Sequence, residues 1–353
     1  MNIEMIKPSV ERVVEDDPLK KIEIAARTCY KSEANITDDS SIRMVKRLIK
    51  NKHYAMLEHA LFEFHIYNRP AIRDLLEKCK MSKFCNVCYG SIFNKECNFV
   101  FINLRTIIEE EFTEFWVLLE ERFPQFRELR DVAFENNQLE FVARRGVALS
   151  KFSEWNTLTV KIVCDRGVSH ELVRHRTFSF AQESQRYVNY KKNDWFQFIE
   201  PSTFADWDER VQKDYLICLA NCAETYNKMI ESNRTPQEAR AVLPNSTKTE
   251  IVMTGDRYAW KHFIDLRYYE TTGKVHPEMG IIADKIFDIW HPLSDGDGRF
   301  VADTTDGEIH LHKFRAAYNY DAWVGSYVGD MSNYVYDEGV KDFVKDVGDL
   351  IDY

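Results

Sequence analysis

The sequence has little of what marks several large classes of protein. Eight cysteines in 353 residues are too few for a disulfide scaffold, so we expect reduced thiols and a cytoplasmic location. No apolar run approaches the roughly 18 residues that a membrane helix needs. The N-terminal segment also lacks the apolar centre of a secretory signal. The net charge of −10 disfavours nucleic-acid binding, because phosphate contacts dominate that affinity. We therefore expect neither a membrane nor a nucleic acid as a partner.

Glycine-rich and helical metal-binding motifs are absent too. The chain has no G-x-G-x-x-G after a strand, no G-x-x-x-x-G-K-[ST] and no H-E-x-x-H. A bound nucleotide or flavin would therefore be held by side chains rather than by a glycine-rich loop. What the chain does have is apolar material for a core: 44% of its residues are hydrophobic, which excludes a disordered chain.

Apolar periodicity indicates an α+β protein. Helical spacing predicts helices near 41–50, 206–231 and 255–269, and Thr235 followed by Pro236 is typical of a helix start. Strict alternation predicts half-buried strands at 62–66 and 158–164. Because helices and strands follow one another without a βαβ rhythm, we expect the α+β class.

The most informative segment runs from Ser169 to Tyr187. It gathers three arginines and two histidines in an acidic chain, namely His170, Arg174, His175, Arg176 and Arg186. Arginine offers a planar fork of donors and keeps its charge, which suits a phosphate or an electron-rich heterocycle. By composition alone, a solvated basic face paired with its own glutamates is an equally good interpretation.

The order of these residues favours the ligand-binding interpretation. Arg174-His175-Arg176, seven residues and then Ser184 resembles the signature of the flavin-dependent thymidylate synthases. Other stretches resemble the same family in the same order: Ala25 to Tyr30, His53 with Leu57-Glu58-His59, Ala239 to Pro244, and Thr254 to Arg267. The resemblance covers roughly residues 1–65 and 158–290.

The resemblance implies a fold and an activity. It implies an α+β fold with mixed helices and an antiparallel sheet. Family members transfer the methylene group of 5,10-methylenetetrahydrofolate to dUMP and reduce it with hydride from FAD, which NADPH recharges. The product is dTMP. By similarity we expect FAD and NADPH as cofactors, dUMP and the folate as small-molecule substrates, and a homotetramer.

The resemblance also assigns residues to roles. Arg267 is expected to be catalytic, facing the pyrimidine and favouring ionisation at N3, because a guanidinium beside developing negative charge stabilises that charge. The residues expected to bind dUMP are Glu171, Arg174, Gln182, Glu183, Ser184, Gln185, Arg186, Arg240 and Arg267. Those expected to contact FAD are His53, Ala55, Glu58, Arg174, His175, Arg176, Gln182, Asp256, Arg257, Tyr258 and His262. No metal is expected in this site.

Helical spacing gives three further expectations. Asp256 and Arg267 are eleven residues apart, about three turns, so both should project from one helix face. Arg240 should lie just inside the helix that Pro236 opens, within reach of an anion near that end. Trp260 and Phe263 are expected to pack in the core rather than to contact a ligand.

Two departures from the family pattern support a second candidate function. Asp256-Arg257-Tyr258 stands where the family usually has Asn, any residue and Arg, which moves the arginine by about 100° around a helix. Ala55 stands where Ser or Thr is usual, which removes a hydroxyl donor. The alternative is a nucleotide-binding or regulatory homologue that retains the dUMP site but has lost flavin chemistry.

Residues 66–157 separate the two family-like parts, and we expect them to form an inserted subdomain. Their apolar pattern predicts a strand at 99–103 and an amphipathic helix near 107–123. Its four thiols, Cys79, Cys85, Cys88 and Cys97, could form a tetrahedral zinc site, although buried apolar cysteines are the favoured interpretation. A zinc-containing module that binds single-stranded nucleic acid through 174–186 is disfavoured by the net charge. Residues 295–353 carry 13 acidic and five basic residues and are expected to form an acidic extension of the 1–65 and 158–294 core.

Overall fold

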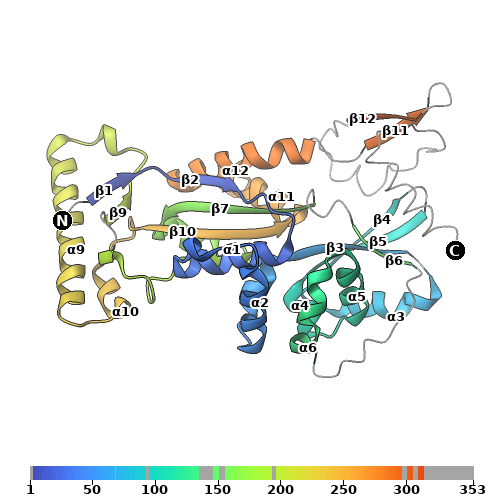
Figure 1. Cartoon of the computed structure of the whole chain (residues 1–353). Coiled ribbons are helices and arrows are strands. Elements are labelled where there is room, and N and C mark those ends of the chain that lie inside the picture. The colour runs from blue at the N-terminus through green and yellow to red at the C-terminus, as the bar shows by residue number, and fades with distance from the viewer. Residues whose placement is uncertain are drawn as a thin grey trace. The chain divides into compact units, whose positions relative to one another are not determined.

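The structure is a computed structural model, and it describes residues 3–67, 69–92, 95–134, 146–150, 156–192, 196–295, 300–304 and 309–313. The chain forms two compact units (Figure 1). Unit 1 comprises Met1–Met44 and Leu158–Ile289, and unit 2 comprises Val45–Thr157 and Trp290–Tyr353. Most of the expected acidic extension, 295–353, lies outside the described residues. Within it β11 (Phe300–Thr304) and β12 (Ile309–Lys313) pair antiparallel. The division into core, insertion and extension stays a prediction.

The main sheet of unit 1 has the strand order β2-β7-β10-β8. These strands are β2 (Ser9–Arg12), β7 (Thr157–Asp165), β10 (Lys248–Asp256) and β8 (Ser179–Gln182). β2 runs antiparallel to β7, and β8 runs antiparallel to β10. A separate parallel pair joins β1 (Ile3–Ile6) to β9 (Phe196–Ile199). Helices combined with antiparallel pairing confirm the α+β class.

Five helices of unit 1 begin at capping side chains that the sequence supplies. They are α1 (Pro18–Tyr30), α8 (Arg166–Leu172), α9 (Glu209–Glu231), α10 (Pro236–Ala239) and α11 (Arg257–Arg267). A further helix, α12, spans Pro277–Asp295. Twice, a sheet strand ends on an aspartate that caps the next helix: Asp165 joins β7 to α8, and Asp256 joins β10 to α11. A side-chain oxygen there satisfies backbone N–H groups that the first helical turn leaves unpaired. These two strand-to-helix junctions fix where α8 and α11 leave the sheet.

Helix α9 confirms the long helix expected near 206–231. It packs with α10 and β1 around a core cluster that includes Tyr190, Phe196, Phe198 and Tyr226 (Figure 1). The expected start at Thr235 is also confirmed, since the Thr235 hydroxyl and the Glu238 carboxylate form a reciprocal capping box.

Unit 2 is built on a second sheet with the strand order β4-β5-β3-β6, in which every pair is antiparallel. The strands are β3 (Leu61–Tyr67), β4 (Asn86–Ile92), β5 (Lys95–Asn103) and β6 (Val147–Leu149). The helices that accompany them are α3 (Arg73–Met81), α4 (Leu104–Glu109), α5 (Thr113–Arg122) and α6 (Arg130–Ala133). Helix α2 (Ser40–Lys50), as expected from its apolar stripe, spans the boundary between the units in sequence.

Two expectations for this region were wrong in detail. The strand β3 is not half-buried, because side chains on both of its faces are covered. Phe64 packs against Phe115 of α5, and Glu63, on the other face, is only 1% exposed. The Glu63 carboxylate is accommodated by the side chains of His65 (2.9 Å) and Asn156 (2.5 Å). The single helix expected near 107–123 is two helices, α4 and α5. They are separated at Glu111, whose φ of 52° lies outside the helical region.

Aromatic side chains form the core of unit 2. The ring of Phe64 on β3 stacks on Phe115 of α5 with centroids 4.1 Å apart, and Trp116 meets Phe126 edge-on at 5.4 Å. The buried Glu120 accepts hydrogen bonds from Trp116 Nε1 at 2.6 Å and Arg130 Nε at 2.8 Å, so its charge is compensated inside this core. Among the described residues, no helix is both long enough and apolar enough to cross a membrane.

Replacing Phe64 by alanine should destabilise the protein by about 3–5 kcal/mol, because a fully buried ring stacked between two layers leaves a cavity that the core fills only in part. The matched control is Tyr89→Ala on β4 of the same sheet, a side chain that is 58% exposed and should cost far less. The free energy of unfolding from urea titration measures both. Equal losses for the two variants would contradict this account of the core.

Candidate functional site

The arginine-rich segment lies in unit 1, between α8 and β8. Helix α8 starts at Asp165, whose carboxylate accepts the Val168 N–H at 2.8 Å. After α8 the chain turns tightly, with His175 N donating to Leu172 O and Phe178 N donating to His175 O. It then enters β8, where Gln182 pairs with Ile251 of β10. The Arg174-His175-Arg176 motif therefore occupies a hydrogen-bonded turn held between a capped helix and a sheet strand.

Arg267, in the last turn of α11, is the best-defined side chain of this region. Its Nε donates to His175 Nε2 at 3.0 Å, and its Nη1 donates to a Glu171 carboxylate oxygen at 3.2 Å. The structure thus brings together three residues that the sequence analysis assigned to the site. Among the described residues, Nη2 of Arg267 has no hydrogen-bond partner, so its two N–H groups are available to a ligand.

The hydrogen bond from Arg267 requires a neutral histidine. Nε2 of His175 can accept only if it carries no proton, which leaves the ring proton on Nδ1. Burial, followed by the charges of Arg267 and His262, lowers the pKa of His175 to about 4. The ring is 8% exposed and packs against Phe263 with centroids 5.0 Å apart. Near neutral pH, His175 is therefore an uncharged acceptor that orients the guanidinium.

The expectation that Asp256 and Arg267 share a helix face was wrong. Asp256 precedes α11 as its N-cap, and one carboxylate oxygen accepts the N–H groups of Tyr258 and Ala259, each at 2.9 Å. Trp260 and Phe263 are fully buried, as expected of core residues, and Trp260 Nε1 donates to Leu158 O at 3.0 Å. Asp256 thus anchors the start of the helix that carries Arg267.

Gln182, Glu183 and Ser184 are fixed by contacts on both sides of the chain. Gln182 Nε2 donates to Ser169 Oγ at 2.7 Å and lies 3.3 Å from Thr249 Oγ1. Glu183, 2% exposed, accepts from Lys248 Nζ at 3.1 Å. Ser184 N donates to Cys29 O at 2.9 Å. This segment is held between β10 and the end of α1.

A cluster of lysines around Glu250 reinforces that position. Glu250 pairs with Lys31 (2.6 Å), Lys161 (2.8 Å) and Lys248, and Lys248 also reaches Glu183. Burial acts to raise the pKa of Glu250, but the charge of Lys248 and the hydrogen bonds from Lys161, Lys248 and Lys31 outweigh it and lower the pKa to about 2. The carboxylate stays ionised and ties α1, β7 and β10 to the Glu183 segment.

Three arginines of the segment point their charge into solvent: Arg174, Arg176 and Arg186 are all exposed. Among the described residues, Arg174 and Arg176 form no ion pair, and the Arg186 guanidinium lies 5.1 Å from the ring centroid of Tyr187. The alternative interpretation, a basic face paired with its own glutamates, therefore fails for Arg174 and Arg176. Gln185, by contrast, is largely buried, with 9% exposed.

Arg240 lies at a helix end, not inside a helix. α10 has only four residues, and Arg240 is its C-cap and the first residue of a 3₁₀ turn, Arg240–Val242. The expected position just inside the helix was wrong because the helix stops after one turn. Its side chain is exposed and, within the described part of the chain, makes no ion pair.

Arg166 was missed by the sequence analysis. It is the first residue of α8 and is partly buried, and its Nη1 lies 3.4 Å from Thr249 Oγ1. Burial lowers the pKa of Arg166, and the nearby charge of Arg240 acts in the same direction. Tyr190, Cys164 and Glu183 act on the pKa in the opposite direction, and a charged donor of this kind suits an anion. Its position directly after the cap Asp165, eight residues before the motif, was the available signal.

The flavin candidates His53, Ala55 and Glu58 lie in unit 2, at or within the 3₁₀ helix Tyr54–His59. His53 and Ala55 are exposed, and Glu58 pairs with Arg105 at 2.8 Å. Arg257, Tyr258 and His262 lie on α11 in unit 1, where His262 is exposed.

The four cysteines of the insertion do not come together. Cys79 and Cys97 are fully buried, Cys85 is partly exposed, and Cys88 Sγ lies 3.7 Å from Asn86 Oδ1. Across the described ranges, no three metal-binding side chains are close enough to hold an ion.

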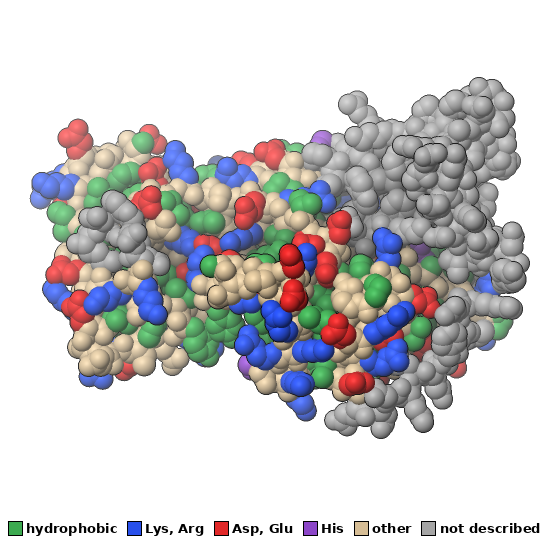
Figure 2. Space-filling model, viewed as in Figure 1, with side chains coloured by type: hydrophobic (Ala, Val, Ile, Leu, Met, Phe, Trp, Pro, Cys, Tyr) green, Lys and Arg blue, Asp and Glu red, His purple; other side chains and the backbone are tan. Residues whose placement is uncertain are grey.

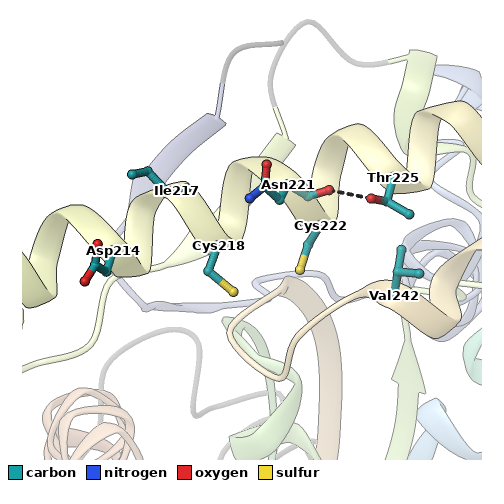
Figure 3. A pocket seen from close by; sticks show the side chains of 7 residues that line it. All are labelled: Asp214, Ile217, Cys218, Asn221, Cys222, Thr225 and Val242. Carbon is teal, nitrogen blue, oxygen red and sulfur yellow. Dashed lines mark hydrogen bonds between the residues drawn. The ribbon is translucent and has the colours of Figure 1, made fainter.

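A pocket of about 360 Å³ lies on α9, lined by Asp214, Ile217, Cys218, Asn221, Cys222, Thr225 and Val242 (Figure 3). None of the predicted site residues lines it, and its lining has no cationic side chain. On the face of the molecule in Figure 2, acidic and basic side chains are interspersed over the described residues.

Comparison with known proteins identifies the family. The sequence model of the family described as "Thymidylate synthase complementing protein" matches residues 12–78 and 120–293. This is well over half of the chain, and the chain therefore belongs to this family. The match leaves out residues 79–119, which include β4 and β5 of unit 2.

Curated relatives agree with the family match. A protein of Corynebacterium aurimucosum named "Flavin-dependent thymidylate synthase" is 34% identical over 160 residues, which are 39% of this chain and 63% of the relative. A Mycobacterium tuberculosis protein of the same name is 40% identical over 118 residues, which are 30% of this chain and 46% of the relative. The aligned part thus spans about half to two thirds of the length of these relatives.

Two solved structures are similar to the chain at low identity. They are of the "UMP/dUMP methylase PolB" from Streptomyces cacaoi, with 5-Br dUMP and with 5-Br UMP. Both share 16% identity with the chain and cover 83% of it and 93% of their own length, with TM-scores of 0.37 and 0.39.

The buried neutral His175 predicts a pH dependence of stability. Its pKa is lowered in the folded state, so between pH 6.5 and 4 the unfolded chain binds more protons, and stability is present above pH 6.5 and lost as the pH falls toward 4. Urea titrations at pH 7 and pH 4.5 should show that the wild type loses about 2–3 kcal/mol more than His175→Asn. The exposed His53→Asn is the matched control and should behave like the wild type. An unchanged pH dependence in His175→Asn would contradict the assignment.

Proposed function

We propose that this protein is a flavin-dependent thymidylate synthase. It would convert dUMP to dTMP with the methylene group of 5,10-methylenetetrahydrofolate, reduced by hydride from FAD that NADPH recharges. The observation that carries the proposal is the arrangement of Arg267, held by neutral His175 and by Glu171 with one amino group left for a ligand. The family match supports the proposal, because Glu171, His175 and Arg267 all lie within the matched residues 120–293.

The chemistry of the donor set fits a nucleotide and a flavin. Arg174 and Arg176 offer solvent-facing guanidinium groups with no ion pair among the described residues, which suits the diphosphate of FAD. Arg166, Arg186, Arg240 and Ser184 suit the phosphate of dUMP. In such a site, bound FAD supplies the hydride that reduces the transferred carbon.

The residues of the chain have defined tasks in this proposal. Arg267 donates from Nη2 toward the pyrimidine edge and stabilises negative charge that develops at N3 and the neighbouring carbonyl. His175 accepts from Arg267 Nε and stays neutral, so it fixes the guanidinium without adding a competing charge. Glu171 holds the opposite side of the same group at 3.2 Å. Because these contacts exist before substrate binds, the site needs little reorganisation.

The remaining assignments belong to the same proposal. Gln182, Glu183 and Gln185 complete the dUMP site, and His53, Ala55, Glu58, Asp256, Arg257, Tyr258 and His262 contribute to FAD binding. We propose that the protein acts as a cytoplasmic homotetramer without a metal, a nucleic acid or a membrane as a partner.

Two observations favour the second candidate, a nucleotide-binding homologue without flavin chemistry. The Asp256 carboxylate is used as a helix cap, and Glu58 is paired with Arg105, so both are engaged within the chain. An absorption spectrum of the purified protein with FAD, followed by an assay of dTMP formation with NADPH and methylenetetrahydrofolate, separates the two. Flavin binding with dTMP formation supports the synthase, whereas dUMP binding without flavin binding or turnover supports the homologue.

Arg240→Gln and Arg166→Gln should each weaken dUMP binding about 10- to 100-fold, because each removes a charged hydrogen-bond donor from the phosphate site. The matched control is Arg234→Gln, an exposed arginine six residues before Arg240 whose contact with Glu238 is 3.9 Å long. Isothermal titration of dUMP measures all three. The phosphate assignment is wrong if Arg234→Gln lowers the affinity as much as Arg240→Gln. Deoxyuridine, which lacks the phosphate, should bind the wild type and both site variants alike.

A further inference from the structure

A helix of the insertion packs against one of the segments proposed to bind FAD. The segment is the 3₁₀ helix Tyr54–His59, and the helix is α4. Directly after the 3₁₀ helix, Ala60 O accepts the N–H of Leu104, the first residue of α4, at 2.9 Å. Residues 79–119 lie outside the family match, so α4 is a feature of this chain that the family model does not describe.

The sheet of unit 2 places α4 beside that segment. Leu61, the first residue of β3, pairs with Asn103, the last residue of β5. The 3₁₀ helix leads into β3 and β5 leads into α4, so both helices lie at the same end of this strand pair. Asn103 also caps α4, because its Oδ1 accepts the N–H of Thr106 at 2.9 Å. The start of α4 is therefore fixed next to the 3₁₀ helix.

One side chain of α4 reaches the 3₁₀ helix. Arg105 Nη1 donates to Glu58 Oε1 at 2.8 Å. Its Nε donates to Glu109 Oε2 at 2.6 Å, and its Nη2 lies 3.4 Å from Glu109 Oε1. Glu109, one helical turn further along α4, thus binds the guanidinium at two points and fixes its plane. The guanidinium in turn fixes one carboxylate oxygen of Glu58.

The second carboxylate oxygen of Glu58 is available to a ligand. Among the described residues, no hydrogen-bond donor contacts Oε2, and the Glu58 side chain is 26% exposed. An ionised carboxylate only accepts hydrogen bonds, so Oε2 suits an N–H or O–H group. FAD carries such donors on its isoalloxazine ring and on its hydroxyl groups. Glu58 can therefore accept from bound FAD while Arg105 holds its other oxygen.

We propose that Arg105 is a positioning residue for FAD binding, which the insertion supplies. Arg105 orients the Glu58 carboxylate so that its Oε2 accepts a hydrogen bond from the bound cofactor. This inference rests on the proposed function, since it takes FAD as the cofactor. It gives part of the insertion a role in cofactor binding.

A surface ion pair without a function is the competing interpretation of this contact. Arg105 and Glu58 are 36% and 26% exposed, and pairs of this kind contribute little to the stability of a folded protein. An arginine that orients Glu58 has a different effect, because it holds the side chain in place before the cofactor arrives and so lowers the ordering cost of binding. That effect strengthens the binding of FAD and leaves the binding of dUMP unchanged.

The test is titration of the full chain with FAD, followed by flavin fluorescence. Arg105→Gln should weaken FAD binding about tenfold, because Glu58 is then no longer held in place. The affinity for dUMP and the free energy of unfolding in urea should stay close to those of the wild type. Arg105→Lys keeps the charge but loses the planar fork, so it should weaken FAD binding almost as much.

The matched control is Lys80→Gln on α3, which removes another cation of the insertion. Lys80 is exposed, lies outside the family match and pairs with Glu77 at 2.9 Å. This variant should bind FAD like the wild type. If Lys80→Gln weakens FAD binding as much as Arg105→Gln, the effect is one of general charge and the proposal is wrong.

A double-mutant cycle tests whether Arg105 acts through Glu58. In a Glu58→Ala background there is no carboxylate to orient, so Arg105→Gln should weaken FAD binding no further. A further tenfold loss in that background would overturn the proposal, and so would equal FAD affinity of the wild type and Arg105→Gln. Failure of the wild type to bind FAD would contradict the proposed function as well, which distinguishes the two failures. Should Arg105→Gln not fold, Arg105→Lys decides the same question.

Discussion

The candidate site depends on a hydrogen bond between two basic side chains, only one of which can carry a positive charge. Arg267 donates to His175, and this is favourable only while the imidazole is neutral. Burial against Phe263 supplies that condition, and the charge of Arg267 strengthens it by disfavouring a second cation nearby. The arginine thus maintains the protonation state of its own acceptor. A Glu171 contact on the other side fixes the plane of the guanidinium, so the free amino group has one direction in which to meet a ligand.

The backbone that carries these side chains is anchored by acidic residues. Asp165 and Asp256 end sheet strands and cap α8 and α11, the two helices that bear Glu171 and Arg267. Glu250, ionised among three lysines, binds the chain at Glu183 to the sheet and to α1. Some of the acidic residues of unit 1 therefore anchor the arginine-rich segment, whose exposed side chains carry positive charge. The cluster of Glu250 and its lysines holds the chain at Glu183 in place, because the loss of one partner would leave another charge buried and unpaired.

Sequence patterns predicted the regular elements well and the ends of elements poorly. α9, β3 and β7 follow from periodicity because each is long enough to repeat its pattern several times. The break between α4 and α5 rests on the backbone of Glu111 alone, and periodicity carries no signal for a single residue with positive φ. The buried Glu63 carboxylate depends on Asn156, which lies 93 residues away in the sequence. Contacts of that range are set by tertiary packing.

Site residues could be predicted from the sequence where they matched the family pattern. They could not be predicted where their role depends on the side chains that surround them in the fold. The family resemblance assigned Glu171, His175 and Arg267 to the site, and the structure brings these together by direct contacts. It did not find Arg166, whose distinction is a partly buried guanidinium facing Arg240 with no ion pair in the described chain. Whether an arginine forms an ion pair depends on the side chains around it in the fold. The sequence alone therefore does not distinguish Arg174 from Arg43. In the structure Arg43 pairs with Asp39 at 3.2 Å, whereas Arg174 faces solvent without an ion pair among the described residues.

The substitution at Asp256 shows how one residue can serve the fold and alter the chemistry together. The family usually has asparagine there, and both side chains can accept backbone N–H groups at a helix start. The aspartate does so twice, at 2.9 Å each, and its negative charge also interacts favourably with the positive end of the α11 dipole. Asparagine would leave an amide N–H₂ free to donate, and aspartate has no donor to offer. The aspartate therefore keeps the cap of the helix that carries Arg267. Under the proposed function, it would offer bound FAD one hydrogen-bond donor fewer than asparagine.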